Sequence, residues 1–191
     1  MYGRMESYTV KIGDDNMKFR CAGLTNDSIV DGPGLRFTIW TQGCEHHCPS
    51  CHNPQTWDMK GGYEEDTDSV IEKIKNNPML DGVTLSGGDP FYQAKAMADI
   101  AGKIHAETNL NVIAYTGFTY EQLIKDSTPE NGYLDLLKEC DYLIDGPFVL
   151  AQRSLELKFR GSRNQRFIDV KRSLKENSVI ELSDEEVSNL K

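Results

Sequence analysis

Three cysteines lie within eight residues of one another, at Cys44, Cys48 and Cys51. Their C-x3-C-x2-C spacing lets one loop fold its thiolates around a single inorganic centre, and thiolates are the ligands that zinc and iron–sulfur clusters prefer. A closed zinc site needs four ligands, and a disulfide needs two cysteines. Three thiolates instead suit a four-iron cluster with one iron free of protein sulfur, where an exogenous ligand can bind through nitrogen and oxygen.

The same spacing leaves a zinc site open as an alternative. His46, His47 or His52 would complete it, because zinc sites with three cysteines and one histidine are common. The two other cysteines, Cys21 and Cys140, are far apart and are expected to pack in the core as small apolar residues. An odd total of five cysteines does not fit a secreted disulfide framework.

A second motif, "LSGGDP", spans residues 85–90 at the end of a predicted strand. Glycine has no Cβ, so Gly87 and Gly88 allow the backbone to approach a ligand closely and to expose its amides and carbonyls. Asp89 adds a carboxylate acceptor. On its own the motif is more often a tight turn, and it gains weight only together with the cysteine loop.

The elements that position these motifs alternate between strands and helices. Strands are predicted at residues 17–24, 35–42, 82–86, 111–115, 141–146 and 166–170. Helices are predicted at residues 67–77, with Asp66 or Thr67 as N-cap, at 92–108, at 120–126 after Thr119, and from Pro129 to about 139.

This alternation predicts an α/β fold with a mostly parallel sheet and crossover helices, either an open sheet or an incomplete barrel. Chemistry in such folds sits at the carboxyl ends of the strands. The cysteine loop, "GGDP", "YTGF" and "DGPF" each follow a predicted strand. The four loops are therefore expected to share one mouth.

The chain has 191 residues, a length that suits one α/β domain. Its formal net charge of −9 argues against nucleic-acid binding. The arginine-rich segment "RGSRNQR" at 160–166 is a local exception. No apolar run would span a membrane or serve as a secretory signal, so a cytoplasmic location is predicted. We expect a single domain over residues 1–172 and a polar, acidic tail over 173–191 that is peripheral or partly disordered.

Several segments together resemble a known family. The cysteine spacing followed by Gly-Gly-acidic-Pro is similar to the radical S-adenosylmethionine enzymes. The segments "SIVDGPGLRFTIWTQGC" and "CHNPQTW" resemble activating enzymes of glycyl-radical enzymes. With "YTGF", "LIDGPF" and "RGSRNQR", the resemblance narrows to the activating proteins of anaerobic ribonucleoside-triphosphate reductases and runs from about residue 19 to 170. It implies an incomplete radical-SAM-type β/α barrel.

The resemblance also implies cofactors and their contacts. Cys44, Cys48 and Cys51 would hold a [4Fe–4S] cluster, and the amine and carboxylate of S-adenosyl-L-methionine would chelate the fourth iron. The remaining cofactor contacts implied are Gly87, Gly88 and Asp89 at the methionine amino end, Ser50, Cys51 and His52 along the adenosyl part, and Tyr115 and Thr116 in a further wall. Asp89 stands where glutamate is commonest in the superfamily.

The activity implied is oxidation of a protein glycine. Reductive cleavage of S-adenosylmethionine gives a 5′-deoxyadenosyl radical, which removes hydrogen from a glycine Cα of the reductase large subunit. The cofactors carry this chemistry, so no side chain is expected to be catalytic in itself. A one-electron donor such as flavodoxin would reduce the cluster.

Partner contacts are predicted at two places. Asp31, in "DGPG", would contact the incoming glycine loop, although the same four residues also read as an ordinary turn. Arg160, Arg163 and Arg166 would bind partner carboxylates, with a solvated basic loop as the alternative. Two other functions stay open: an activase of a different glycyl-radical enzyme, and a non-catalytic zinc-binding interaction protein.

Overall fold

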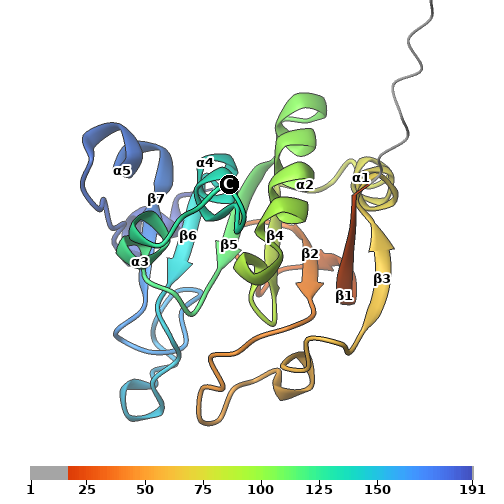
Figure 1. Cartoon of the computed structure of the whole chain (residues 1–191). Helices are drawn as coiled ribbons and strands as arrows, with labels where there is room; N and C mark the ends of the chain where they lie inside the picture. Colours follow the sequence, from red (N-terminus) through yellow and green to blue (C-terminus); the bar gives the residue numbers. More distant parts are fainter. Residues whose placement is uncertain (1–16, 191) are drawn as a thin grey trace, which may run out of the picture.

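A computed structural model describes residues 17–190, and within them seven strands form one sheet (Figure 1). The strands are β1 (Lys18–Ser28), β2 (Arg36–Thr41), β3 (Tyr63–Asp66), β4 (Gly82–Gly87), β5 (Asn111–Tyr115), β6 (Tyr142–Asp145) and β7 (Arg166–Asp169). Their order across the sheet is β3-β1-β2-β4-β5-β6-β7. The first sixteen residues of the predicted domain and the last residue of the predicted tail lie outside the described residues.

The centre of the sheet is parallel, as predicted. β2 pairs with β4, β4 with β5, and β5 with β6, all in parallel register. Both edges are antiparallel, formed by β1 and β3 on one side and by β7 on the other. The loop 29–35 between β1 and β2 is too short for the crossover that a parallel pair needs, so these strands run in opposite directions. The α/β class is confirmed, and the sheet is mixed.

Six α-helices lie within residues 17–190: α1 (Thr67–Lys75), α2 (Ala94–Glu107), α3 (Tyr120–Lys125), α4 (Tyr133–Glu139), α5 (Val170–Glu176) and α6 (Asp184–Ser188). The predicted caps are confirmed. The Asp66 side chain accepts from the first turn of α1, and Thr119 forms a capping box with Gln122 at α3. The helix predicted from Pro129 begins later, because Gly132 N–H first closes a turn onto the Thr128 carbonyl. None of these helices combines the length and apolar character needed to cross a bilayer.

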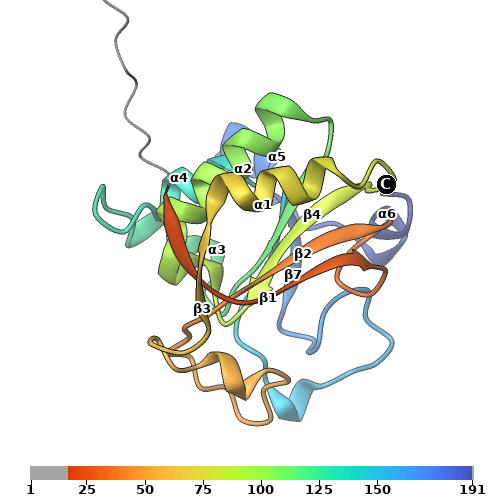
Figure 2. The same ribbon diagram turned by 90° about the vertical axis from the view of Figure 1, so that its right-hand side faces the viewer.

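The two faces of the central sheet have different roles. Leu85 and Ala114 belong to the main core, and their chain neighbours Ser86 and Tyr115 point to the opposite face and line a cavity. Figure 2 shows α1, α2 and α4 above the curved strands, with the long loops on the other side. One face is therefore packed against helices, and the other is available for a site.

The end of the chain is packed rather than peripheral. Leu182 and Val187 are buried with Ile113, Ile144 and Phe167 in a second apolar cluster. Leu182 N–H also donates to the Phe167 carbonyl at 2.7 Å. This arrangement differs from the expected peripheral or partly disordered tail, because several apolar side chains spaced along a polar stretch pack against the two cores.

Candidate active site

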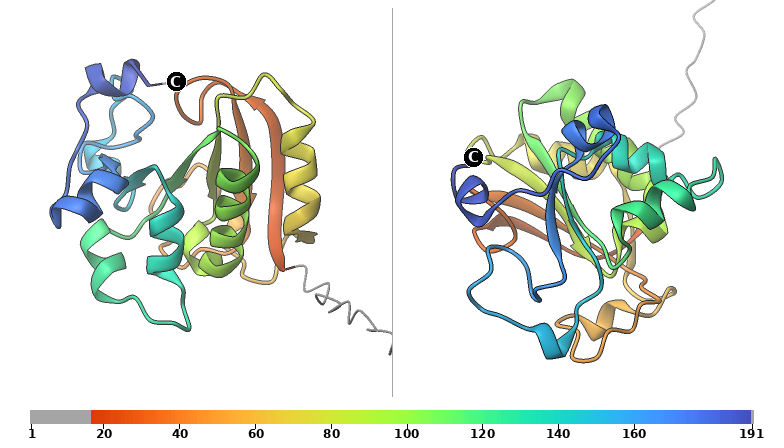
Figure 3. Two further views of the ribbon diagram at one scale, coloured as in Figure 1. Left: turned by 90° about the horizontal axis from the view of Figure 1, so that it is seen from above. Right: turned by 90° about the vertical axis from the view of Figure 1, so that its left-hand side faces the viewer.

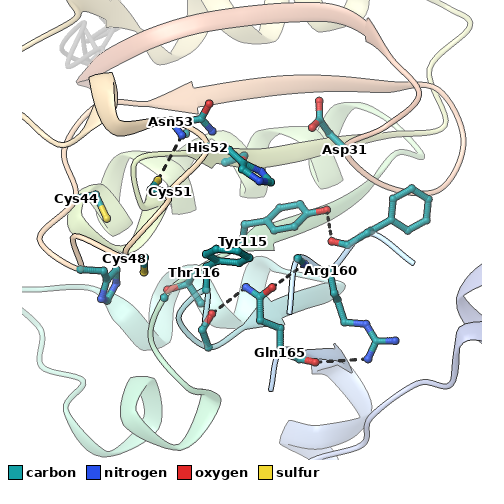
Figure 4. Close-up of a pocket in the computed structure, with 18 of the residues that line it drawn as sticks. Asp31, Cys44, Cys48, Cys51, His52, Asn53, Tyr115, Thr116, Arg160 and Gln165 are labelled. Carbon is teal, nitrogen blue, oxygen red and sulfur yellow. Dashed lines mark hydrogen bonds between the residues drawn. The ribbon is translucent and has the colours of Figure 1, made fainter. Parts of the chain in front are cut away.

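The four loops predicted to share one mouth surround a single cavity (Figure 4). It lies at the carboxyl ends of β2, β4, β5 and β6 and has a volume of about 520 Å³. Cavities that hold a cofactor or small ligand typically measure about 300–1,000 Å³. Figure 4 shows the three clustered cysteines on one side of the cavity, Asp31 and Arg160 on the other, and Tyr115 between them.

Cys44, Cys48 and Cys51 all line this cavity. Backbone hydrogen bonds hold their loop, including Gly43 N–H to the Thr56 carbonyl at 2.7 Å and Cys51 N–H to the Cys48 carbonyl at 3.0 Å. Cys44 is buried, and this burial raises the pKa of its thiol to about 11. Binding to a cationic centre would hold Cys44 as a thiolate at neutral pH.

These cysteines fit a cluster better than a single ion. Within residues 17–190, no three His, Cys, Asp or Glu side chains converge on a point that would hold one metal ion. A cluster does not require such convergence, because each thiolate binds a different iron. Asn53 N–H already donates to the Cys51 sulfur at 3.3 Å, a type of contact that tunes iron–sulfur centres.

The three histidines that a zinc site would use are directed elsewhere. His46 Nε2 lies 2.7 Å from the Asp89 carboxylate. His47 is exposed and contacts the Glu45 carbonyl through Nδ1. His52 lines the cavity, with its ring centroid 5.7 Å from that of Phe148. Within the part of the chain that the structure describes, no histidine joins the three cysteines in a group that could hold one metal ion.

Gly87 and Gly88 line the cavity, and they also allow close packing. Gly87 has a φ of +105°, in the region that favours glycine. A Cβ on Gly88 would lie 2.3 Å from the Gly43 carbonyl oxygen. Their lack of side chains lets the end of β4 contact the backbone that leads into the cysteine loop.

Asp89 is placed differently from the expectation. It is 1% exposed and does not line the cavity. One oxygen accepts from His46 Nε2, Thr116 Oγ1 at 2.8 Å and Gly117 N–H at 2.9 Å. The other accepts from Phe91 N–H at 2.9 Å. The carboxylate thus joins the cysteine loop to the ends of β4 and β5, and its contact with a methionine amino group stays a prediction.

The sequence analysis named His46 only as a possible zinc ligand and missed its contact with Asp89. Its imidazole packs edge-on against Phe118, at a centroid distance of 4.6 Å. A Cβ on Gly117 would lie 2.4 Å from the His46 ring, so this contact requires a glycine. A histidine between the first two cysteines was visible in the sequence, but its partner is 43 residues away.

The other predicted cofactor contacts are mostly at the cavity. Tyr115 and Thr116 line it, and the Tyr115 hydroxyl donates to the Phe159 carbonyl at 2.9 Å. Asp31 lines the opposite wall and accepts from Thr38 Oγ1 at 3.1 Å. Ser50 is exposed and lies outside the cavity lining. The structure therefore brings all but Ser50 and Asp89 to the cavity wall.

Comparison with known proteins identifies the family. A family model described as a 4Fe-4S single cluster domain matches residues 30–168. The anaerobic ribonucleoside-triphosphate reductase-activating protein of Vibrio cholerae is 33% identical over 144 residues, which cover 72% of this chain and 89% of that protein. The protein of the same name from Escherichia coli K12 is 31% identical and is covered to 90%. This chain belongs to the family of anaerobic ribonucleoside-triphosphate reductase-activating proteins.

A further relative has the name of a different activating enzyme. The pyruvate formate-lyase-activating enzyme of Clostridium pasteurianum is 33% identical over 114 residues, but these cover only 48% of its length. As a reductase-activating protein, the chain is a radical S-adenosylmethionine oxidoreductase that generates glycyl radicals. Its cofactors are a [4Fe–4S] cluster and S-adenosylmethionine, so a non-catalytic zinc protein is no longer a supported alternative.

The arginine-rich segment of this activating protein is mostly paired within the chain. Arg160 binds Asp184 and Glu181, and is nearly buried. Arg166 binds Asp145 at 2.5 Å and Glu121 at 2.8 Å. The prediction that these two arginines bind partner carboxylates is therefore not supported by their contacts. Arg163 remains exposed, 3.4 Å from Glu156.

The pairing of Arg166 gives a pH-dependent prediction. Hydrogen bonds from Arg166 lower the pKa of Glu121 from 4.5 to about 2. Because the folded state depresses this pKa, the stabilisation is present above pH 4.5 and is lost as the pH falls toward 2. Glu121 is 59% exposed, so solvent screening limits the contribution to about 1 kcal/mol or less.

Urea unfolding of wild type and Glu121→Gln checks this. We expect the variant to be less stable by up to about 1 kcal/mol at pH 7 and the gap to narrow at pH 3. Glu176→Gln, at an exposed glutamate at the end of α5, is the matched control. A gap that is the same at both pH values would contradict the proposed role of the ion pair.

Proposed function

We propose that this protein activates an anaerobic ribonucleoside-triphosphate reductase by oxidising one glycine of its large subunit. The observation that supports this most is that Cys44, Cys48 and Cys51 line the same cavity as the ends of β4, β5 and β6. Together the bound cofactors supply the chemistry: one-electron cleavage of S-adenosylmethionine and removal of a hydrogen atom from the glycine Cα.

The protein's own groups hold and orient the cofactors under this proposal. The three cysteines would bind three irons of the cluster, and Asn53 N–H would donate to one ligating sulfur. Gly87 and Gly88 would form the wall beside the methionine part, with Tyr115 and Thr116 next to it. His52 would lie along the adenosyl part, with Ser50 on the loop beside it. The fold that carries these residues would be an incomplete radical-SAM-type β/α barrel.

The opposite wall is the proposed route for the glycine. Asp31 faces the cavity from the loop between β1 and β2, and Thr38 and Ser28 orient its carboxylate through hydrogen bonds. In this position Asp31 would accept a backbone N–H of the entering segment. A one-electron donor such as flavodoxin would reduce the cluster from the exposed side of the cysteine loop, around Pro49 and Ser50.

Anaerobic reconstitution tests the proposal. The protein is loaded with iron and sulfide, reduced, and mixed with S-adenosylmethionine and an anaerobic reductase. We expect 5′-deoxyadenosine to form and a glycyl radical to appear in the electron paramagnetic resonance spectrum of the reductase. Formation of 5′-deoxyadenosine without a radical on the reductase would reject this partner. If the reconstituted protein contains the cluster but gives neither 5′-deoxyadenosine nor a radical, the proposed reaction is rejected.

A further inference from the structure

Large apolar side chains are exposed at the mouth of the cavity. Val30 and Leu155 both line it and are 74% and 88% exposed, and Ile29, next to Val30, is 72% exposed. We call Ile29, Val30 and Leu155 the apolar rim. A single exposed apolar residue needs no explanation, but a group around a binding cavity is a mark of an interaction site.

The apolar rim comes from two segments far apart in the sequence. Ile29 and Val30 belong to the loop between β1 and β2, and Leu155 to the segment between β6 and β7. Figures 2 and 3 show both segments on the same side of the sheet, away from α1 and α2. The fold therefore brings exposed apolar groups from two directions to one opening.

Hydrogen bonds to buried groups anchor the first of these loops. Thr84 Oγ1 donates to the Asp31 carbonyl at 2.9 Å, directly after Val30. Arg36 is fully buried and donates to the Pro33 carbonyl at 3.1 Å. Burial lowers the pKa of Arg36 to about 10, so it still carries its charge at neutral pH. The loop backbone is thus fixed, while the side chains of Ile29 and Val30 face solvent.

The second segment is anchored on both sides of Leu155. Ser154 N–H donates to the Gly161 carbonyl at 3.2 Å, and Arg163 N–H donates to the Gln152 carbonyl at 2.9 Å. The Tyr115 hydroxyl holds the Phe159 carbonyl from the sheet. Leu155 therefore lies in a bend whose two ends are held by hydrogen bonds.

The reaction itself requires recognition beyond the target residue. A glycyl-radical-generating enzyme acts on a glycine, which has no side chain to recognise. Selectivity must then come from the backbone and from the neighbouring side chains. The backbone contacts are available at the polar wall near Asp31, whereas the rim offers mainly apolar surface.

We infer that the apolar rim binds bulky apolar side chains that flank the target glycine in the partner's polypeptide segment. This inference rests on the proposed function and specifies the substrate segment: an exposed chain with apolar residues close to the glycine and no charged side chain against Val30 and Leu155. Burying two such contacts on binding contributes enough to change affinity by roughly tenfold or more.

Peptide binding tests the inference. The probe is a fluorescent peptide of about nine residues with a central glycine flanked by valine and leucine; nine extended residues span about 30 Å. A second peptide carries serine in place of both flanking residues. Binding is followed by fluorescence anisotropy with reconstituted wild type, the double variant Val30→Ser/Leu155→Ser, and Met79→Ser. Met79 is the matched control because it is 73% exposed and does not line the cavity.

We expect the double variant to raise the Kd of the apolar peptide at least about tenfold and Met79→Ser to change it less than about twofold. The serine peptide should bind wild type and double variant equally weakly, since the lost contacts are the same. Iron content and circular dichroism show that the variants are folded. Equal affinity of the apolar peptide for wild type and double variant, or no binding of it to wild type, would overturn the inference.

A separate readout distinguishes this failure from failure of the proposed function. Reconstituted wild type is incubated with reductant and S-adenosylmethionine in the absence of peptide. If 5′-deoxyadenosine forms while the rim changes have no effect on peptide binding, only the role of the rim is wrong. If wild type forms no 5′-deoxyadenosine, the proposed reaction itself is rejected.

Discussion

Replacing Cys48 by alanine is expected to remove the iron–sulfur cluster and, with it, the cleavage of S-adenosylmethionine. Cys48 lines the cavity between Cys44 and Cys51, and two remaining thiolates cannot hold three corners of a cube. We expect the loss of cleavage to exceed about 100-fold, because even changes to outer-shell partners of a metal site cost about 10–100-fold. Iron and sulfide analysis after anaerobic reconstitution, together with 5′-deoxyadenosine formation, measures both effects.

Cys140→Ala is the matched control. Cys140 is also a free cysteine, but it is fully buried at the end of α4, where burial raises the pKa of its thiol. It packs in the main core, so its truncation is expected to reduce stability slightly and to leave the iron content unchanged. A Cys48→Ala protein that retains four irons and forms 5′-deoxyadenosine would show that Cys48 is not a cluster ligand.

Asp89→Ala is expected to destabilise the metal-free protein by about 3 kcal/mol, because buried donors left without an acceptor cost about 1–3 kcal/mol each. Phe91 N–H and Gly117 N–H would both lose the carboxylate, as would Thr116 and His46. Asp89→Asn keeps one acceptor oxygen and should lose less. Because His46 would no longer be held to β4, cluster loading should also fall in Asp89→Ala.

Urea unfolding of the metal-free proteins measures the first effect, and iron content after reconstitution measures the second. Asp126→Ala is the matched control, since Asp126 is an exposed aspartate at the end of α3. His46→Gln should lower the iron content, whereas His47→Gln, at an exposed neighbour, should not. A loss below about 1 kcal/mol in Asp89→Ala, within the range of ordinary surface changes, would refute the structural role given to this carboxylate.

The sequence predicted best those elements whose patterns are local. β5 was expected at residues 111–115 and is observed there, because "NVIAY" is a short buried run with turn signals on both sides. Thr119 and Gln122 form the expected helix start from contacts within one turn. The convergence of four loops followed from the topology alone, since parallel strands place their carboxyl ends at one edge.

Elements that depend on distant partners were missed. β3, with the sequence "YEED", is polar and mostly exposed, and its strand conformation comes from pairing with β1. The C-terminal segment contains too few apolar residues to predict its packing, yet Leu182 and Val187 find a complementary surface on β5 to β7. Sequence periodicity carries no information on such docking.

In the site, too, local features were predicted and contacts between distant segments were missed. The cysteines and glycines were found because their residue types and spacing are themselves the signal. Asp89 was expected to contact the ligand, and that stays a prediction. Its four partners within the chain come from three separate segments and were not visible in the sequence. The pairing of Arg160 with Asp184 was hidden for the same reason.

The most direct test of a cluster with one iron open to S-adenosylmethionine is electron paramagnetic resonance of the reduced wild-type protein before and after the nucleotide is added. We predict that the added S-adenosylmethionine changes the g values of the cluster signal, because the nucleotide binds the iron that no cysteine holds. A cluster signal that stays unchanged at saturating nucleotide would contradict this account.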